Sequence, residues 1–336
     1  MTIKKILTIF IIIPCNLFAQ QTINDSIFNN NIYRSFTIYI PQIYNPTQST
    51  PLVFNLHGLG GSSITAMYHA DFRNIADTAN FIIVHPQGMP NSLGENHWNY
   101  GQSNIDDISF FNALYSYMLT NYNIDVDRVY SAGMSNGGAM SYSLACNLSS
   151  KIAAIASVTG AMSSYQHLSC NPTHPTPIME IHGTADSTVL FAWVTPGIEY
   201  WRNYNNCNIN ADTTQIGNIV LSDSSTVEHI VYNNGDNGVT TELFKIIGGE
   251  HTWPGSNFSN GVTNYDINAS IEIWRFFSRY DINGLINPAT EIIDNNIYKH
   301  NLVKITDLLG RETMHNKQSI IYIYKNNKVK KKIIIE

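Results

Sequence analysis

The chain has 336 residues, of which 43% are hydrophobic and 13% are charged, and its formal net charge is −6 at pH 7. This length and hydrophobic content allow one large core with an appended segment and exclude a mostly disordered protein. The acidic balance, with no basic stripe, argues against a nucleic-acid-binding protein, because phosphate recognition requires clustered Lys and Arg.

The N-terminus has the pattern of a secretion signal. Two lysines precede an apolar run, residues 6–13, which is too short to span a bilayer, and Ala19 ends a small-residue cleavage sequence. We therefore expect residues 1–19 to be a signal peptide, the mature chain to be secreted, and no integral membrane span to remain. A lipid anchor is less favoured, because Pro14 stands before Cys15 where a lipoprotein signal needs a small residue.

Strand-like and helix-like segments then alternate up to about residue 280. Short apolar runs are typical of buried parallel strands, and they predict strands at 35–40, 52–56, 81–85, 129–132, 153–158, 177–182 and 242–247. Helical patterns fall at 107–121, 138–146, 196–204 and 266–280. This alternation predicts the α/β class, with a mostly parallel, doubly wound sheet covered on both faces.

A glycine-rich loop, residues 57–61 with the pattern H-G-x-G-G, follows the expected strand 52–56. In an α/β-hydrolase such a loop turns a backbone N–H toward the carbonyl oxygen that becomes an oxyanion. We assign the two oxyanion-hole donors to the backbone N–H groups of Leu59 and Asn136. A glycine-rich turn that only packs is the alternative, and the position of the loop ahead of the serine motif favours the catalytic interpretation.

The segment 133–137 places Ser135 between two glycines directly after the expected strand 129–132. This G-x-S-x-G pattern is typical of a nucleophile elbow, a turn so tight that glycine is needed two positions either side of the serine. The dipole of the following helix favours negative charge beside the serine. A plain strand-to-helix turn is the structural alternative.

A nucleophilic serine needs a histidine base, and the base needs a carboxylate that fixes its tautomer. The chain order in this fold is Ser, then Asp or Glu, then His. Asp186 follows the expected strand 177–182, so it lies at the edge where α/β sheets hold their sites. The remaining candidate acids stand in polar stretches: Asp212, Asp223 and Asp236.

The predicted base is His251, in a glycine-rich loop that follows the expected strand 242–247. His57 and His182 precede glycines at strand ends, and we interpret them as groups that orient the loops. His229 lies inside an expected strand, and the other downstream histidines lie beyond the last helix. The chain order therefore predicts a catalytic triad of Ser135, Asp186 and His251.

Three cysteines remain after removal of the signal peptide: Cys146, Cys170 and Cys207. In an oxidising compartment one disulfide is expected, and Cys146 with Cys170 is the favoured pair, because both lie at the end of the sheet away from the serine. Three buried thiols are the alternative.

Trp98 and Trp253 are candidate walls of a substrate cleft, because an indole offers a flat apolar face. Packing of the loops is an equally weighted alternative. The sequence contains no metal-ligand spacing and no phosphate-binding loop with lysine, so we expect neither a metal nor another cofactor.

The hydrophobic pattern of the sequence changes near the C-terminus. Asn287-Pro288 follows the last helical pattern, and short alternating strands begin near residue 291. We expect a hydrolase domain at 20–282, followed at 283–336 by a linker and a small all-β domain.

Together these motifs resemble secreted esterases of the polyhydroxybutyrate depolymerase-like and feruloyl esterase-like type, in carbohydrate esterase family 1. The resemblance covers about residues 34–280, and besides the motifs above it includes the segments 98–99, 106–107, 122–125, 128–130, 182–186 and 249–255. It implies an α/β-hydrolase in which Ser135, Asp186 and His251 hydrolyse feruloyl or acetyl esters on plant polysaccharide. Glu250 departs from the family, which has glycine there, and its carboxylate could raise the pKa of the base or point to water.

Two other functions stay open. The same triad could depolymerise a poly(3-hydroxybutyrate)-type polyester, and a non-catalytic surface carbohydrate-binding scaffold would be a protein of another class. A scaffold has no need for three catalytic groups in order. The segments 301–311 and 321–335 resemble the C-terminal sorting domain of the type IX secretion system of Bacteroidetes, which implies secretion machinery as a partner and an extracellular or cell-surface location.

Overall fold

The computed structural model describes residues 20–101, 103–258 and 260–286, together with the backbone of three strands after residue 301. The expected signal peptide lies outside the described residues. The chain divides into two compact units, Met1–Ile286 and Asn287–Glu336.

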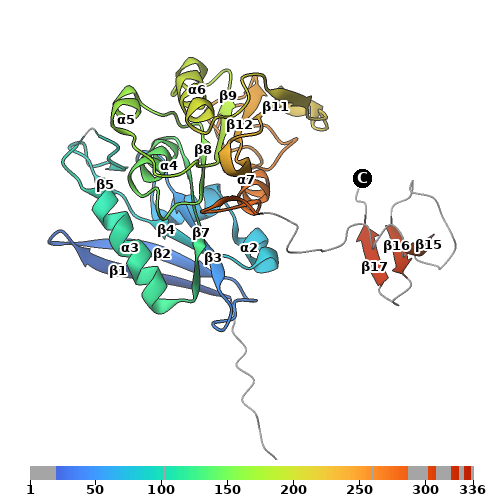
Figure 1. Cartoon of the computed structure of the whole chain (residues 1–336), viewed down its shortest axis with the longest axis horizontal. Coiled ribbons are helices and arrows are strands. Elements are labelled where there is room, and N and C mark those ends of the chain that lie inside the picture. Colours follow the sequence, from blue (N-terminus) through green and yellow to red (C-terminus); the bar gives the residue numbers. More distant parts are fainter. Residues whose placement is uncertain are drawn as a thin grey trace, which may run out of the picture. The chain divides into compact units, whose positions relative to one another are not determined.

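A ten-stranded sheet forms the centre of the first unit, as Figure 1 shows, with the order β1-β2-β4-β3-β7-β8-β9-β12-β11-β10. The parallel strands are, in sheet order, β4 (Ile82–Pro86), β3 (Thr50–Leu56), β7 (Ile124–Met134), β8 (Ala154–Val158), β9 (Ile178–Gly183) and β12 (Thr241–Ile247). Antiparallel strands complete the two edges: β1 (Gln21–Asn29), β2 (Ile32–Ile40), β11 (Thr226–Tyr232) and β10 (Asp212–Gln215). The predicted α/β-hydrolase sheet is confirmed.

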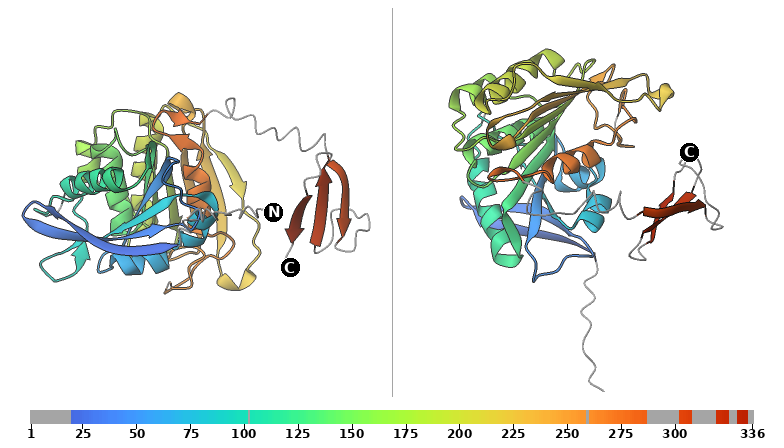
Figure 2. Two further views of the ribbon diagram at one scale, coloured as in Figure 1. Left: turned by 90° about the horizontal axis from the view of Figure 1, so that it is seen from below. Right: turned by 45° about the vertical axis from the view of Figure 1, so that its right-hand side comes forward.

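Helices cover both faces of this sheet (Figure 2). One face packs against α3 (Asp107–Asn121), α4 (Asn136–Asn147) and α6 (Thr195–Tyr204). The other face packs against α2 (Arg73–Ala79) and α7 (Ala269–Phe277). The remaining short elements of this unit are α1 (Ser63–His69), β5 (Met89–Pro90), β6 (Asn96–His97), α5 (Ser164–Ser169), η1 (Phe191–Trp193), η2 (Leu221–Asp223), η3 (Asp236–Gly238), β13 (Tyr280–Asp281) and β14 (Gly284–Leu285).

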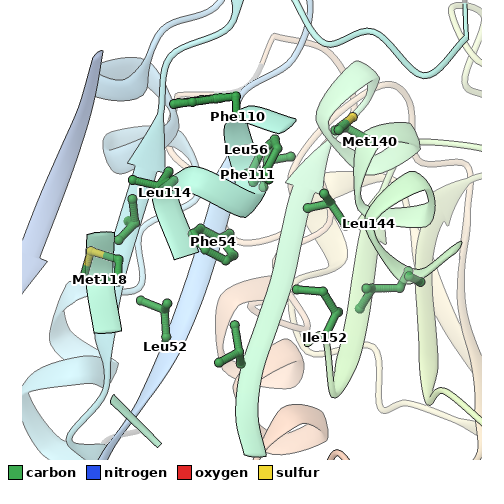
Figure 3. Packing of buried hydrophobic residues seen from close by; sticks show 14 of the residues in the cluster. Leu52, Phe54, Leu56, Phe110, Phe111, Leu114, Met118, Met140, Leu144 and Ile152 are labelled. Atoms are coloured by element: carbon green, nitrogen blue, oxygen red, sulfur yellow. The ribbon is translucent and has the colours of Figure 1, made fainter. Parts of the chain in front are cut away.

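Alternation along the strands divides the core into two layers. On β3, Leu52 and Phe54 face α3, whereas Val53 faces the opposite layer, because successive side chains of a strand point to opposite faces. Phe54 and Phe111 meet edge to face with their ring centroids 5.6 Å apart, and Figure 3 shows this contact between the sheet and α3. The fully buried run of β3 explains why its sequence is apolar throughout.

Of the strands in this ten-stranded sheet, β1 and β10 were missing from the sequence prediction, and β11 appeared in it only as the strand expected around His229. The sequence of β1 is mostly polar, since as an antiparallel edge strand it packs only Ile23 and Ile27 against the core. β10 is fully exposed and β11 is mostly half-buried, so neither has the apolar run by which buried strands are recognised.

A disulfide joins Cys146, in the last turn of α4, to Cys170, which caps the C-terminal end of α5. Gln166 of α5 also donates to the backbone oxygen of Ala139 on α4, at 2.7 Å. Cys207 is a buried free thiol. The bond therefore attaches α5 to the helix that follows the serine motif.

The second unit contains a three-stranded antiparallel sheet in the order β15-β16-β17. Its strands are β15 (Leu302–Asp307), β16 (Ser319–Tyr324) and β17 (Val329–Ile333). Across both units, none of the helices in the described part of the chain has the length and hydropathy to span a membrane.

Candidate active site

Ser135 occupies a strained turn between β7 and α4. Its φ of 54° and ψ of −118° lie in a region that side-chain-bearing residues rarely adopt. A Cβ on Gly133 would lie 2.5 Å from the carbonyl carbon of Gly137, and a Cβ on Gly137 would lie 2.5 Å from the oxygen of Leu56. Both glycines are therefore required by close backbone approach, as the G-x-S-x-G motif predicts.

The loop after β3 lies directly against this turn. A Cβ on Gly58 would be in van der Waals contact, at 3.5 Å, with the Cβ of Ser135. His57 fixes the loop, because its Nδ1–H donates to the Gly58 oxygen at 2.7 Å and its Nε2 accepts the Gly88 N–H at 3.0 Å. Burial lowers the pKa of His57 to about 4, so this ring is neutral at neutral pH. This position fits the loop-orienting role that we expected for His57.

The two assigned oxyanion donors belong to the helix that follows Ser135 and to the loop that lies against it. Asn136 is the first residue of α4, where a backbone N–H has no partner within the helix. Leu59 lies in the loop that contacts the serine, with its side chain 54% exposed. Among the described residues, neither N–H donates to another backbone group. Their role in binding an oxyanion stays a prediction.

Asp186 and His251 meet at the carboxyl ends of two neighbouring parallel strands, β9 and β12. The Nδ1 of His251 lies 2.8 Å from Oδ2 of Asp186. The other carboxylate oxygen accepts the N–H groups of Thr188 and Val189 at 2.8 and 2.9 Å. This arrangement keeps the proton of the His251 ring on Nδ1 and leaves Nε2 available as a base.

Asp186 is ionised at neutral pH. Burial raises its pKa, but hydrogen bonds from His182, His251 and the Val189 N–H outweigh burial and lower the pKa to about 2. A buried carboxylate in this state serves to orient the base and to stabilise the imidazolium formed during catalysis.

The strand register brings Ser135 to the same edge of the sheet. Met134 of β7 pairs with Val158 of β8, which pairs with Ile181 of β9. Ser135 comes directly after Met134, the last residue of β7. The loops that carry Asp186 and His251 likewise leave the sheet at this edge. In the described part of the chain no hydrogen bond joins Ser135 Oγ to His251. Such bonds often tighten only in the substrate complex.

Trp98 does not form a cleft wall, because it is 1% exposed. Its backbone N–H and oxygen are both bound by the Asn136 side chain, at 2.7 and 3.1 Å. Its indole N–H donates to the His57 oxygen at 3.0 Å. The interpretation as a substrate wall is therefore wrong for Trp98, which instead joins the elbow to the loop after β3. The sequence carried no sign of this, because the contacts join Trp98 to Asn136 and His57, which are about forty positions away along the chain.

Trp253 is also 1% exposed, and its indole N–H donates to Ser270 Oγ at 3.2 Å. It nevertheless borders a pocket of about 130 Å³ together with His69, Tyr68 and Phe258. The rings of Tyr68 and Phe258 approach edge to face at 6.4 Å and are 46% and 67% exposed. This aromatic pair was not predicted from the sequence, because Tyr68 belongs to α1 and Phe258 to a loop far along the chain.

Glu250 accepts a hydrogen bond from the loop that follows His251. Its Oε2 accepts the Val262 N–H at 3.0 Å, so the carboxylate holds the loop that follows His251.

Within the described residues, no group of three or more His, Cys, Asp or Glu side chains could hold a metal ion.

Two further buried groups lie behind Asp186, namely Glu180 and His182 on β9. From the sequence, His182 was expected only to orient a loop, and no role was expected for Glu180. Their spacing was a usable signal, since residues two apart on a strand share a face. A carboxylate in an apolar run must also find a partner when it is buried.

Comparison with known proteins agrees with the fold. A family model described as phospholipase/carboxylesterase matches residues 40–219. A bifunctional acetylxylan esterase/xylanase of Neocallimastix patriciarum is 26% identical over 80% of this chain, which spans 36% of that relative's length. Feruloyl esterase D of Neurospora crassa is 27% identical over 78% of this chain and 86% of its own. The solved acetyl xylan esterase from Aspergillus awamori superimposes with a TM-score of 0.57 at 14% identity, over 77% of this chain and 99% of that one.

Proposed function

The chain belongs to the phospholipase/carboxylesterase family, and from this premise we propose that it is a serine carboxylic ester hydrolase with Ser135, Asp186 and His251 as its triad. The observation that carries the proposal is the strained backbone of Ser135. Strain of this kind costs on the order of 1–3 kcal/mol and persists where the surroundings enforce it for a function. The hydrogen bond between Asp186 and His251 supports the same proposal.

In the proposed reaction, Nε2 of His251 takes the proton of Ser135 Oγ as this oxygen attacks the ester carbonyl carbon. The carbonyl oxygen becomes an oxyanion that accepts hydrogen bonds from the N–H groups of Leu59 and Asn136. Collapse of this intermediate breaks the ester bond, and the leaving alcohol takes the proton from His251. Water then attacks the acyl-enzyme with His251 again as the base, which releases the acid and restores Ser135.

We propose feruloyl or acetyl esters on plant polysaccharide as substrates. The names of the acetylxylan and feruloyl esterase relatives support this class. The exposed pair Tyr68 and Phe258 borders a pocket that also includes Trp253, close along the chain to His251. Aromatic faces of this kind suit a phenolic acyl group or a sugar ring.

A substrate panel tests this assignment. We expect release of ferulate from methyl ferulate or of acetate from acetylated xylan, and little hydroxybutyrate from a polyester film. In the Phe258→Ala variant, loss of one aromatic contact of about 1 kcal/mol should raise KM for methyl ferulate roughly fivefold while turnover of p-nitrophenyl acetate changes little. Leu168→Ala, which removes a 90% exposed side chain outside this pocket, is the matched control.

Other outcomes of the panel would redirect the proposal. Preferred turnover of the polyester would favour the depolymerase function. Absence of turnover on every ester, combined with binding to xylan, would favour a carbohydrate-binding scaffold instead.

We further propose that residues 1–19 are removed on export, that 20–282 form the catalytic domain, and that 283–336 address the protein to secretion machinery. In a host with a type IX system, the full chain should place its esterase activity in the medium or at the cell surface. A chain ending at residue 286 should retain that activity in the periplasm. Equal export of both chains would contradict a sorting role for the tail.

A further inference from the structure

A second histidine lies immediately behind the carboxylate of the proposed triad. His182, at the end of β9, is fully buried, and both of its ring nitrogens face acceptors. Its Nδ1 lies 3.0 Å from Oε1 of Glu180, and its Nε2 lies 3.3 Å from Oδ2 of Asp186 and 2.8 Å from the Val189 oxygen. A neutral imidazole has only one N–H, so a ring that donates at both nitrogens is a cation.

Glu180 completes this buried arrangement. Its other oxygen, Oε2, accepts the hydroxyl of Tyr142 on α4 at 2.9 Å. Burial raises the pKa of Glu180 and raises that of Tyr142 well above its ordinary value, so the phenol remains a hydrogen-bond donor. A buried carboxylate is costly unless it is paired, and the cation of His182 supplies the pair.

Asp186 therefore has two imidazole partners on one oxygen. Its Oδ2 lies 2.8 Å from Nδ1 of His251 and 3.3 Å from Nε2 of His182. Burial lowers the pKa of His182, but hydrogen bonds to Asp186 and Glu180 outweigh burial and raise the pKa to about 10. The result is a continuous path of charged groups from the core to the base.

The elements packed against His182 add no competing charge to it. At the other end of the path, His69 of α1 is electrostatically coupled to His251, since burial and the charge of His251 lower the pKa of His69. Lys245 of β12 is level with His182 in the sheet, but its ammonium binds Glu228 at 2.9 Å. On η1, the Phe191 ring lies 6.1 Å from the His182 ring. On α6, Glu199 is exposed. Among the described residues, the charges in contact with His182 are thus those of Glu180 and Asp186.

We propose that His182, held as a cation between Glu180 and Asp186, is a positioning residue that directs Oδ2 of Asp186 toward His251 and limits the basicity of His251. The inference rests on the proposed triad. The physical reason is that a positive charge beside Asp186 offsets part of the negative charge felt by His251. If His182 becomes neutral, the His251 imidazolium is stabilised more strongly, and deprotonation of the base needs a higher pH.

Variants that balance charge test this proposal. His182→Gln alone leaves Glu180 without its cation, so the main variant is Glu180→Gln/His182→Gln, in which the buried pair is neutral and polar throughout. We expect this double variant to fold, to lose about ten- to hundredfold in kcat because Asp186 is less well placed, and to show its acidic pH limb shifted upward by about half a unit or more. His229→Gln is the matched control, since His229 also pairs with a buried glutamate, Glu242, but belongs to β11.

A folded double variant with unchanged kcat and an unmoved acidic limb would overturn the proposal. A second measurement needs no variant: histidine NMR titration of the wild-type protein should show His182 cationic from pH 6 to pH 9, and a neutral His182 at pH 7 would also overturn it. Failure of the proposed function is distinguishable, because it would appear as absence of ester turnover in the wild-type protein whatever the charge of His182.

Discussion

Replacing Ser135 by alanine should reduce hydrolysis of a simple aryl ester by a factor on the order of 10⁶, to a rate indistinguishable from background. The variant retains the loop after β3 and the Asp186–His251 pair, but it has no oxygen that can form the acyl-enzyme. Initial rates with p-nitrophenyl acetate measure the effect, and thermal unfolding checks that the fold is intact.

The matched control for this variant is Ser116→Ala, which removes an exposed hydroxyl from α3 that donates to the Asn112 oxygen. Its activity should equal that of the wild type. Turnover by the Ser135 variant above one part in a thousand of the wild-type rate would show that another group is the nucleophile.

Replacing Asp186 by asparagine should lower kcat by a factor of about 10⁴. An amide can present N–H to Nδ1 of His251, which favours the wrong tautomer, and it no longer stabilises the imidazolium. Steady-state kinetics on the same aryl ester measure this loss. The fold should persist, because an asparagine side-chain oxygen can still accept the Thr188 and Val189 N–H groups.

Asp212→Asn is the control, since Asp212 is another downstream aspartate but lies exposed on β10. Its kinetics should be unaffected. A loss smaller than tenfold in Asp186→Asn would remove Asp186 from the triad.

The lowered pKa of Asp186 also fixes the direction of one pH effect. A carboxylate whose pKa falls from about 3.8 unfolded to about 2 folded adds stability that is complete above pH 4 and is lost as the pH falls through 2. Loss of activity between pH 5 and 7 would therefore not report protonation of Asp186.

The sequence predicted those parts of the molecule in which local chemistry leaves few choices. Buried parallel strands must be apolar, and the turn at Ser135 requires glycine at 133 and 137, so the central sheet and the elbow could both be recognised. The order of the motifs was enough to choose Asp186 and His251, which the structure brings within hydrogen-bond distance.

Features that depend on contacts between distant parts of the chain could not be predicted from the sequence. Trp98 was equally compatible with a cleft wall and with packing, and only the fold shows that its backbone is bound by Asn136. The polar strand β1 is stabilised by pairing with β2 rather than by its own hydrophobicity. Oδ2 of Asp186 contacts both His182 and His251, and this contact depends on the geometry of a turn that the order of the residues does not specify.

The bond between Cys146 and Cys170 has a practical consequence for producing the enzyme. The two cysteines are separated by 24 positions in the sequence. A disulfide that closes a loop of that size adds roughly 3 kcal/mol to the free energy of unfolding. Recombinant material made in a bacterial cytoplasm will lack this cross-link, and its elbow helix will lose the covalent attachment to α5. Preparations intended for crystallisation or calorimetry should therefore come from a periplasmic or oxidatively refolded source, or they will describe a less heat-resistant form.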